Sequence, residues 1–534
     1  MASSSSTDKH APTENTPLIQ PQNDYQSHIL PRKRLLIVFP ALALVHFTSF
    51  LDQTAITTSI PAIAAGLKTG PSTSWIGASF LMTSVSIQLI NGRFSDIFGR
   101  KPCLITALLV MGLGNLLSGF ARTPAVLYIT RAFSGFGAGA LNGLIQITIS
   151  DITALEHRGY YFGIMGIAVA FGNGLGPVVG GALTQNTSWR WAFWFICPLT
   201  ALAVTYLWFV LPQSESPENV WKKIRSVDWL GVVTNMTAIC LILIPLSRGG
   251  TPDVWKSKTN IIMLVAGCLL FCVFIFLEFR VVKFPIVPKR LFTYGRSTNI
   301  LLAMNLFIGW LFWGNLFYIP LYLQSVRGWS PTMAGLFILP LVIAHGITSG
   351  LSGIIISRLG HYVSVISVGT ALWALGAGAK VTYHRTTPIW QILTFGVFEG
   401  VGVGVCLQPV LVGILAGSDK IDRAGITSVR NFLRDIGAAT GITVSGAILN
   451  TILQNGLQHR FTPEFISEIT SSIGKLSHLH LTPEDQELIS RVYMEGIHGV
   501  FMSFAVLAVV LFVVTFLIED YGLRSREEVL EEVE

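Results

Sequence analysis

Charged residues are scarce in this sequence. Asp, Glu, Lys and Arg together make up 12% of its 534 residues, whereas hydrophobic residues make up 51%. An ordinary soluble domain is about 25% charged, and a single core cannot hide this much apolar surface in a chain of this length. The composition therefore argues against a soluble globular protein.

Sequence signatures of enzymes and metal sites are also absent. No G-x-x-x-x-G-K-S/T phosphate loop occurs, which argues against ATP as the energy source, and neither G-x-S-x-G nor H-E-x-x-H is found. The six cysteines include no Cys-x-x-Cys pair, so neither a disulfide scaffold nor a zinc site is expected. We predict a protein that is not an enzyme and that uses no cofactor or metal.

Long apolar stretches are what the sequence has instead. Each is about 20 residues long with few charges, which is enough to cross roughly 30 Å of hydrocarbon as a helix. Backbone amides in lipid must be paired internally, and the short alternating segments of a membrane barrel are missing. We therefore predict an all-α integral membrane protein with 14 transmembrane helices. The predicted helices span residues 35–61, 75–95, 102–121, 125–149, 160–183, 190–212, 227–247, 259–281, 297–323, 332–357, 362–381, 388–416, 425–453 and 497–519.

The positive charges predict the orientation. Lys and Arg gather before the first apolar stretch and in the connections after the second, sixth and eighth stretches. Connections rich in Lys and Arg face the cytoplasm. An even number of spans then places both termini in the cytoplasm.

Two short patterns concern processes outside the membrane. Glu14–Ile19 (E-N-T-P-L-I) fits the acidic dileucine pattern that sorting adaptors read for vacuolar or endosomal delivery, although chance is the alternative in a low-complexity tail. Asn186 begins an Asn-Thr-Ser sequon on the predicted outer side, which makes it a glycosylation candidate close to the membrane.

A charged turn follows the second apolar stretch. Residues 92–102 read G-R-F-S-D-I-F-G-R-K-P. This segment resembles the signature loop of the major facilitator superfamily, usually written G-x-L-a-D-r-x-G-r-k, with Phe94 where leucine is usual. The resemblance implies two pseudo-symmetric six-helix halves that rock about a central site. Asp96 and Arg100 would form a latch by pairing with charges or helix ends of the other half.

Three further segments resemble the 14-helix DHA2 drug:proton antiporter branch of that superfamily. Residues 51–61 (L-D-Q-T-A-I-T-T-S-I-P) look like its first-helix motif. Residues 131–137 (R-A-F-S-G-F-G) look like its fourth-helix motif, with Ser134 in place of glutamine. Residues 172–181 match its G-x-x-x-G-P-x-x-G-G antiporter motif.

The resemblance covers about residues 35–520 and implies a domain organisation. Residues 1–34 would be a disordered cytoplasmic tail, as their Ser, Pro, Asn and Gln content also predicts. Six-helix bundles would occupy residues 35–215 and 291–520, with a loop and an extra transmembrane helix pair in 216–290. Residues 521–534 would be an acidic cytoplasmic tail. The fold resemblance also implies a monomer.

Charges and glycines inside the predicted helices are the candidates for coupling and gating. An arginine within a membrane helix costs about 2.5–3.5 kcal/mol on insertion scales, so Arg131 should face the interior and pair with Asp52 or Asp151. It would repel or relay a proton; a snorkelling arginine is the alternative. The antiporter motif predicts a smooth, bendable stripe for sliding between halves, or for static packing. The stripe residues are Gly172, Gly176, Pro177, Gly180 and Gly181.

Polar residues within the spans are candidates for a substrate pocket. Glu399 is the most specific candidate among them, because a lone carboxylate in a membrane helix could bind a proton or a cationic substrate. A hydrogen-bonded structural acid is the alternative. The other candidates are His46, Gln53, Asn142, Gln146, Asn173, Asn305, Asn315, His345 and Gln408.

The expected function is export of drugs, toxins or secondary metabolites from the cytosol in exchange for protons, at the plasma membrane. One alternative is import of basic amino acids into the vacuole by the same antiport, which the dileucine pattern favours. A second alternative is a sensor of the same fold that does not transport. The expected partners are a small organic substrate, protons and the lipid bilayer, without nucleic acid.

Overall fold

The computed structural model describes residues 30–69, 75–212, 227–248, 257–282, 285–462, 465–466 and 482–522. The secondary structure of these residues is helical and contains no strand, which confirms the all-α prediction. The predicted sorting segment Glu14–Ile19 and most of both predicted tails lie outside the described residues.

The long helices follow the predicted stretches closely. They are α1 (Arg32–Ala55), α3 (Trp75–Phe98), α4 (Arg100–Gly119), α5 (Pro124–Ile152), α6 (Leu155–Asn186), α8 (Ile196–Val210), α10 (Trp229–Arg248), α12 (Lys258–Arg280), α13 (Arg296–Ser325), α14 (Pro331–Leu359), α15 (Val363–Lys380), α16 (Ile389–Ala416), α17 (Arg423–Leu457) and α19 (Pro483–Thr515). Short helices are α2 (Ile60–Leu67), α7 (Trp191–Trp194), η2 (Lys289–Phe292) and η3 (Lys420–Asp422).

Thirteen helices in the described part of the chain are long and apolar enough to cross a membrane, so this is a multi-pass integral membrane protein. Helix α3 has the length but is not among the thirteen. Several of its polar side chains, including Ser84, Gln88 and Asn91, are buried against other helices. Interior packing therefore explains why α3 is less apolar than its neighbours.

Two predicted boundaries differ from the structure for local reasons. The first stretch, 35–61, divides into α1 and α2, because the chain turns after Ala55 and restarts with Pro61 in the first turn of α2. The last helix begins at Pro483 rather than at residue 497. The Thr482 side chain accepts a hydrogen bond from the backbone N–H of Asp485 at 3.2 Å and so caps this earlier start.

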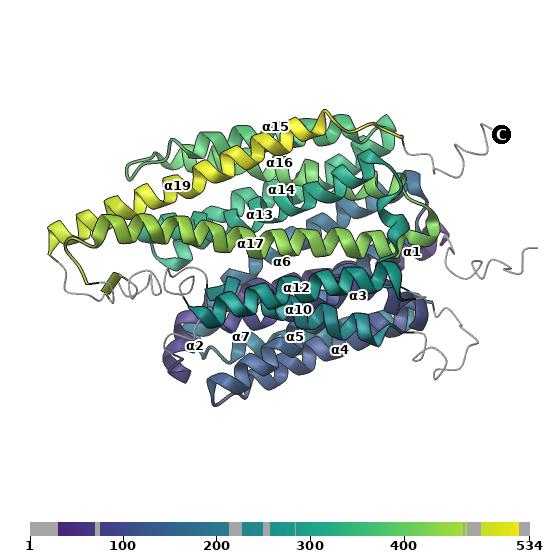
Figure 1. Cartoon of the computed structure of the whole chain (residues 1–534), viewed down its shortest axis with the longest axis horizontal. Coiled ribbons are helices and arrows are strands. Elements are labelled where there is room, and N and C mark those ends of the chain that lie inside the picture. Colours follow the sequence, from purple (N-terminus) through teal and green to yellow (C-terminus); the bar gives the residue numbers. More distant parts are fainter. Residues whose placement is uncertain are drawn as a thin grey trace, which may run out of the picture.

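The long helices form two sets, with α10 and α12 paired beside them (Figure 1). In the N-terminal set (α1 to α8), α1 packs on α6, both α3 and α4 pack on α5, and α4 packs on α8. In the C-terminal set (α13 to α19), α13 packs on α17, both α14 and α15 pack on α16, and α15 packs on α19. The two sets meet where α6 packs on α14 and where α3 packs on α17.

Candidate transport site

A cavity lies between the two helix sets. Four helices of the N-terminal set (α1, α3, α5, α6) and four of the C-terminal set (α13, α14, α16, α17) contribute to its wall. Of the pocket residues predicted from sequence, His46, Gln53, Asn142, Gln146, His345 and Gln408 line it. The predicted residues Asn173, Asn305, Asn315 and Glu399 are not part of its lining.

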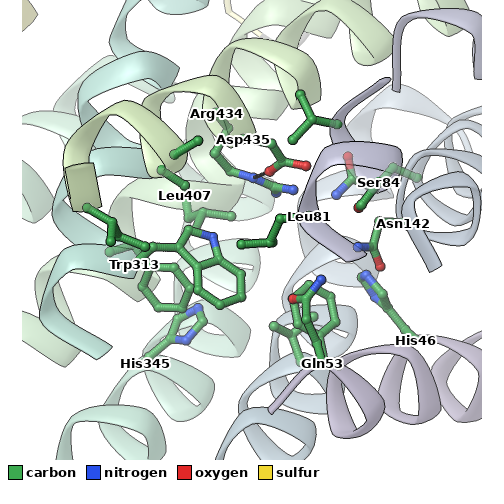
Figure 2. Close-up of a pocket in the computed structure, with 18 of the residues that line it drawn as sticks. His46, Gln53, Leu81, Ser84, Asn142, Trp313, His345, Leu407, Arg434 and Asp435 are labelled. Atoms are coloured by element: carbon green, nitrogen blue, oxygen red, sulfur yellow. Dashed lines mark hydrogen bonds and ion pairs between the residues drawn. The ribbon is translucent and has the colours of Figure 1, made fainter. Parts of the chain in front are cut away.

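Two histidines approach the cavity from opposite sets. His46 on α1 and His345 on α14 are each only 2% exposed, and neither ring has a hydrogen-bond partner at either nitrogen among the described residues. Figure 2 shows the two rings on different sides of the cavity. Leaving a buried polar group unpaired is costly, so both imidazoles are available to a bound solute or to water.

A charged pair on α17 forms another part of the wall. Arg434 Nε donates to Asp435 Oδ1 at 3.0 Å (Figure 2). Gln88 Nε2 on α3 donates to the other carboxylate oxygen at 3.0 Å. Among the described lining residues Asp435 is the one carboxylate, and it is engaged from both helix sets. Sequence reasoning missed this pair, although two adjacent charges within the predicted span 425–453 were a usable signal.

Hydrogen bonds hold the two sets together on the side of the cavity nearer the expected cytoplasmic end. Asn431 Nδ2 on α17 donates to Gln146 Oε1 on α5 at 3.0 Å. Closer to that end, the backbone N–H of Gly92 donates to Ser428 Oγ at 3.0 Å. An added Cβ on Gly92 would lie 2.7 Å from the Ala424 carbonyl oxygen, so this contact between α3 and α17 requires glycine.

Arg131 pairs with Asp52 and not with Asp151. Its Nη1 lies 3.3 Å from Asp52 Oδ1, and the two side chains are 2% and 0% exposed. The same nitrogen donates to Asn115 Oδ1 at 3.4 Å, and the guanidinium carbon lies 4.3 Å from the centre of the Phe80 ring. Arg131 is therefore a buried, paired arginine rather than a snorkelling one.

Asp151 instead belongs to the charged turn. Arg100 lies 2.8 Å from Asp96 and 2.8 Å from Asp151, which is at the end of α5. The sequence predicted that Asp96 and Arg100 each pair with charges or helix ends of the other half. That expectation needs correction for Arg100, because both of its carboxylate partners belong to the N-terminal set, where the end of α5 lies beside the turn between α3 and α4.

Three glycines of the antiporter motif, Gly172, Gly176 and Gly180, face α1. An added Cβ on Gly172 would lie 2.9 Å from the Phe47 carbonyl oxygen, and one on Gly176 or Gly180 would overlap α1 more severely. Gly181 is different, since its added Cβ would meet nothing closer than 3.7 Å. The Pro177 carbonyl accepts a hydrogen bond from Thr58 at 3.1 Å. The stripe thus packs closely on α1 within one set, which fits the static-packing alternative, and these contacts do not lie between the two halves.

A different group of glycines on α6 faces the other set. An added Cβ on Gly163 would lie 2.7 Å from the Ser349 carbonyl oxygen on α14, and one on Gly159 would lie 3.1 Å from the Gly353 carbonyl oxygen. Close approach between the two sets therefore depends on these positions, which the sequence motif did not single out.

Glu399 is not a lone carboxylate. It lies 2.8 Å from the ammonium of Lys380, and both side chains are fully buried. Asn315 Nδ2 donates to Glu399 Oε1 at 3.2 Å, and Lys380 donates to Asn315 Oδ1. The Lys380 nitrogen also lies 4.9 Å from the centre of the Phe501 ring. Sequence reasoning missed Lys380 because a lysine at a predicted helix end is typical of a snorkelling side chain.

Asn186 is the last residue of α6, and its exposed side chain donates to the Ala182 carbonyl at 2.9 Å. Its glycosylation stays a prediction. Among the described residues, no group of three or more His, Cys, Asp or Glu side chains is placed to hold a metal ion.

Comparison with known proteins identifies the family. The model of the Major Facilitator Superfamily matches residues 42–442. Citrate exporter 1 of Yarrowia lipolytica is 35% identical, over 94% of this chain and 75% of the exporter. Efflux pump dotC of Dothistroma septosporum is 32% identical, over 78% of this chain and 72% of the pump.

Solved structures share the fold at much lower identity. The proton:xylose symporter XylE gives a TM-score of 0.61 at 13% identity, over 94% of this chain and 99% of the symporter. The human organic anion transporter MFSD10 gives 0.59 at 14% identity, over 91% of this chain and 100% of that transporter. The family match over residues 42–442 and the relatives above 30% identity establish that the chain belongs to the major facilitator superfamily.

Proposed function

We propose that this protein is a proton-coupled antiporter that exports a small organic solute from the cytosol by alternating access. The observation that carries the proposal is the cavity between the sets, where His46 and His345 present unpartnered rings from opposite sides. A solute bound between the two sets becomes accessible from one side of the membrane or the other when the sets rock about it. Relatives named as an exporter and an efflux pump support the outward direction.

Proton coupling supplies enough free energy for export. One proton that moves down about 100 mV gains roughly 2.3 kcal/mol, and a unit of pH adds about 1.4 kcal/mol. The buried Asp52–Arg131 pair is the proposed proton site of the N-terminal set. Protonation of Asp52 would remove the charge that compensates Arg131, so that proton binding and a rearrangement of the pair would be linked.

We propose organic anions with carboxylate groups as the first substrate class. Asp435, the one carboxylate in the described lining, is already engaged by Arg434 and Gln88, so this lining offers no free acid to a cationic solute. Arg430, directly behind the wall, donates to Asn431 and to the Leu407 carbonyl and forms no ion pair with a described carboxylate. The resulting excess of positive charge favours an anion, and the citrate exporter among the relatives agrees with this.

The charge of the cavity weighs against the vacuolar import of basic amino acids, which needs an available acid. The sensor alternative predicts no solute flux, which the transport assay below tests. The membrane in which the protein resides depends on whether Glu14–Ile19 is read by sorting adaptors, and a tagged full-length chain with that segment intact or substituted would locate it.

The antiport proposal includes an architecture. We propose that α3 also crosses the membrane, which brings the number of spans to fourteen. Residues 35–215 and 291–520 would form the two six-helix halves, and α10 and α12 would be the extra pair of transmembrane helices. Both termini would then lie in the cytoplasm. Labelling of single introduced cysteines from each side of the membrane tests this orientation.

The test of transport is uptake into proteoliposomes with an acidic interior. We expect accumulation of labelled citrate that a protonophore abolishes, and no comparable accumulation of lysine or of a lipophilic cation. Passive movement of a weak acid would favour the alkaline side, so accumulation in the acidic interior identifies exchange for protons. Flux that does not depend on the pH gradient would contradict antiport. Absence of flux for every solute class would favour the alternative of a sensor that does not transport.

A further inference from the structure

Two buried ion-pair clusters occupy corresponding places in the two helix sets. Each cluster contains one carboxylate, one basic side chain and one asparagine that hydrogen-bonds to a charged member. The N-terminal cluster consists of Asp52, Asn115 and Arg131; the C-terminal cluster consists of Asn315, Lys380 and Glu399.

The correspondence extends to position along the helices. Each cluster takes one residue from the first, third and fourth long helix of its set, namely α1, α4 and α5 or α13, α15 and α16. Asp52 and Asn315 lie at nearly the same distance from the start of α1 and α13. The host helices also pack alike, since α4 packs on α5 as α15 packs on α16.

The chemical groups, however, are exchanged between positions. The carboxylate stands on the first helix in the N-terminal cluster and on the fourth helix in the C-terminal cluster. A mere repeat of the sequence would place like residues at like positions. The two sets instead hold the same three kinds of group, one acid, one base and one amide, in different arrangements at the same site.

We propose that Glu399 is a second proton-binding site of this transporter, with Lys380 as its counterion and Asn315 as the neutral bridge. The ion pair holds α15 against α16 while both groups are charged. When Glu399 takes up a proton, Lys380 is left with Asn315 and the rings of Phe501 and Phe504, which compensate a full charge poorly. Protonation of Glu399 therefore breaks the ion pair between α15 and α16 and weakens the contact of the two helices.

Few other titratable groups face Glu399. Tyr383 follows α15, stacks on Tyr322 of α13, and accepts at its carbonyl from His498 of α19. On α14, His345 faces the cavity, and on α17, Arg430 contacts the Leu407 carbonyl of α16. Helix α6 approaches α16 through Gly166, beside Gln408. Lys380 is the charged group in direct contact, so the state of Glu399 is set mainly by that pair.

The test is infrared difference spectroscopy of the purified full chain as the pH is lowered. We expect a carbonyl-stretch band of a newly protonated, buried carboxylic acid that disappears in Glu399→Gln and persists in Asp52→Asn. If Glu399→Gln alone does not fold, the double variant Lys380→Met/Glu399→Gln removes both charges and keeps the test available. A band that is unchanged in the folded Glu399→Gln or double variant would overturn the assignment, as would the absence of any such band.

The link to transport rests on the proposed antiport and is measured separately. We expect the folded double variant to translocate fewer protons for each solute in proteoliposomes, while Asn305→Ala, which changes a buried amide outside both clusters, leaves the ratio unchanged. An unchanged ratio in the double variant would show that the pair is structural and would overturn the proposal. A Glu399 band in a protein without proton-driven flux would refute antiport but leave the proton site standing.

Discussion

The carboxylate of Asp52 lies 3.3 Å from the guanidinium of Arg131, at a point in the N-terminal set where neither side chain is more than 2% exposed. Removing one partner of a buried ion pair typically costs about 3–5 kcal/mol, because the remaining charge is left uncompensated. We therefore expect Arg131→Gln to lower the thermal stability of the purified protein strongly. Asp52→Asn keeps the side-chain shape and should abolish proton-driven uptake even where folded protein is recovered.

The double variant Asp52→Asn/Arg131→Gln separates stability from coupling. Since it removes both charges, we expect much of the lost stability to return without proton-driven uptake. Thermal unfolding and uptake into acid-loaded proteoliposomes measure the two effects. Stability losses of the two single variants that simply add in the double variant would show that the residues do not act as a pair.

The two cavity histidines predict a specific binding phenotype. If His46 and His345 donate to a carboxylate of the solute, each His→Phe change removes a charge-assisted hydrogen bond worth about 1.5–3 kcal/mol. We expect each variant to weaken citrate binding about 10- to 100-fold in titration calorimetry. His361→Phe is the matched control, because His361 is 65% exposed and lies outside the cavity. Equal affinity in all three variants would place the anion elsewhere.

Sequence reasoning located the helices well because each is specified locally by its own apolar run. Thirteen of the fourteen predicted stretches meet the length and composition expected of a membrane span. Helix α3 does not meet the composition criterion because its polar side chains are buried against neighbouring helices, and only the fold shows which helices these are. The late start assigned to α19 had a local signal that was overlooked, namely Thr482 followed by Pro483 and two acidic residues.

The partners of buried charges were harder to predict, since pairing depends on distant segments. Two acids in the sequence, Asp52 and Asp151, were reasonable partners for Arg131. Only the packing of α1 against the other helices of the N-terminal set selects Asp52 over Asp151. Glu399 looked solitary because its partner, Lys380, ends another helix. A charged residue within a span indicates burial, but the sequence does not identify the residue with which it pairs.

A tyrosine outside the membrane spans predicts a pH effect on stability. Burial and the neighbouring Asp422, to which the Tyr294 hydroxyl donates, raise the pKa of Tyr294 above its usual value near 10. The unfolded chain loses this proton at lower pH than the folded protein does. The contribution of Tyr294 is therefore complete below about pH 10 and is lost as the pH rises through the folded pKa.

The measurement is thermal stability across the alkaline range for the wild type and Tyr294→Phe. Because phenylalanine cannot ionise, we expect the stability difference between the two proteins to shrink as the pH rises above about 10. A difference that stays constant through that range would mean that Tyr294 titrates alike in the folded and unfolded chains.

The antiporter motif offers a matched pair of glycine substitutions. An added Cβ on Gly180 would overlap the Ala55 carbonyl of α1, whereas one on Gly181 would meet nothing closer than 3.7 Å. Backbone cannot move aside as a flexible side chain does, so Gly180→Ala should force α6 away from α1, with a stability loss of about 1–3 kcal/mol from overpacking. Gly181→Ala should be tolerated, and it gains helix propensity worth up to about 1 kcal/mol. Thermal unfolding and uptake assays on both variants distinguish close packing at one face of α6 from a general need for glycine, because the latter would impair both variants alike.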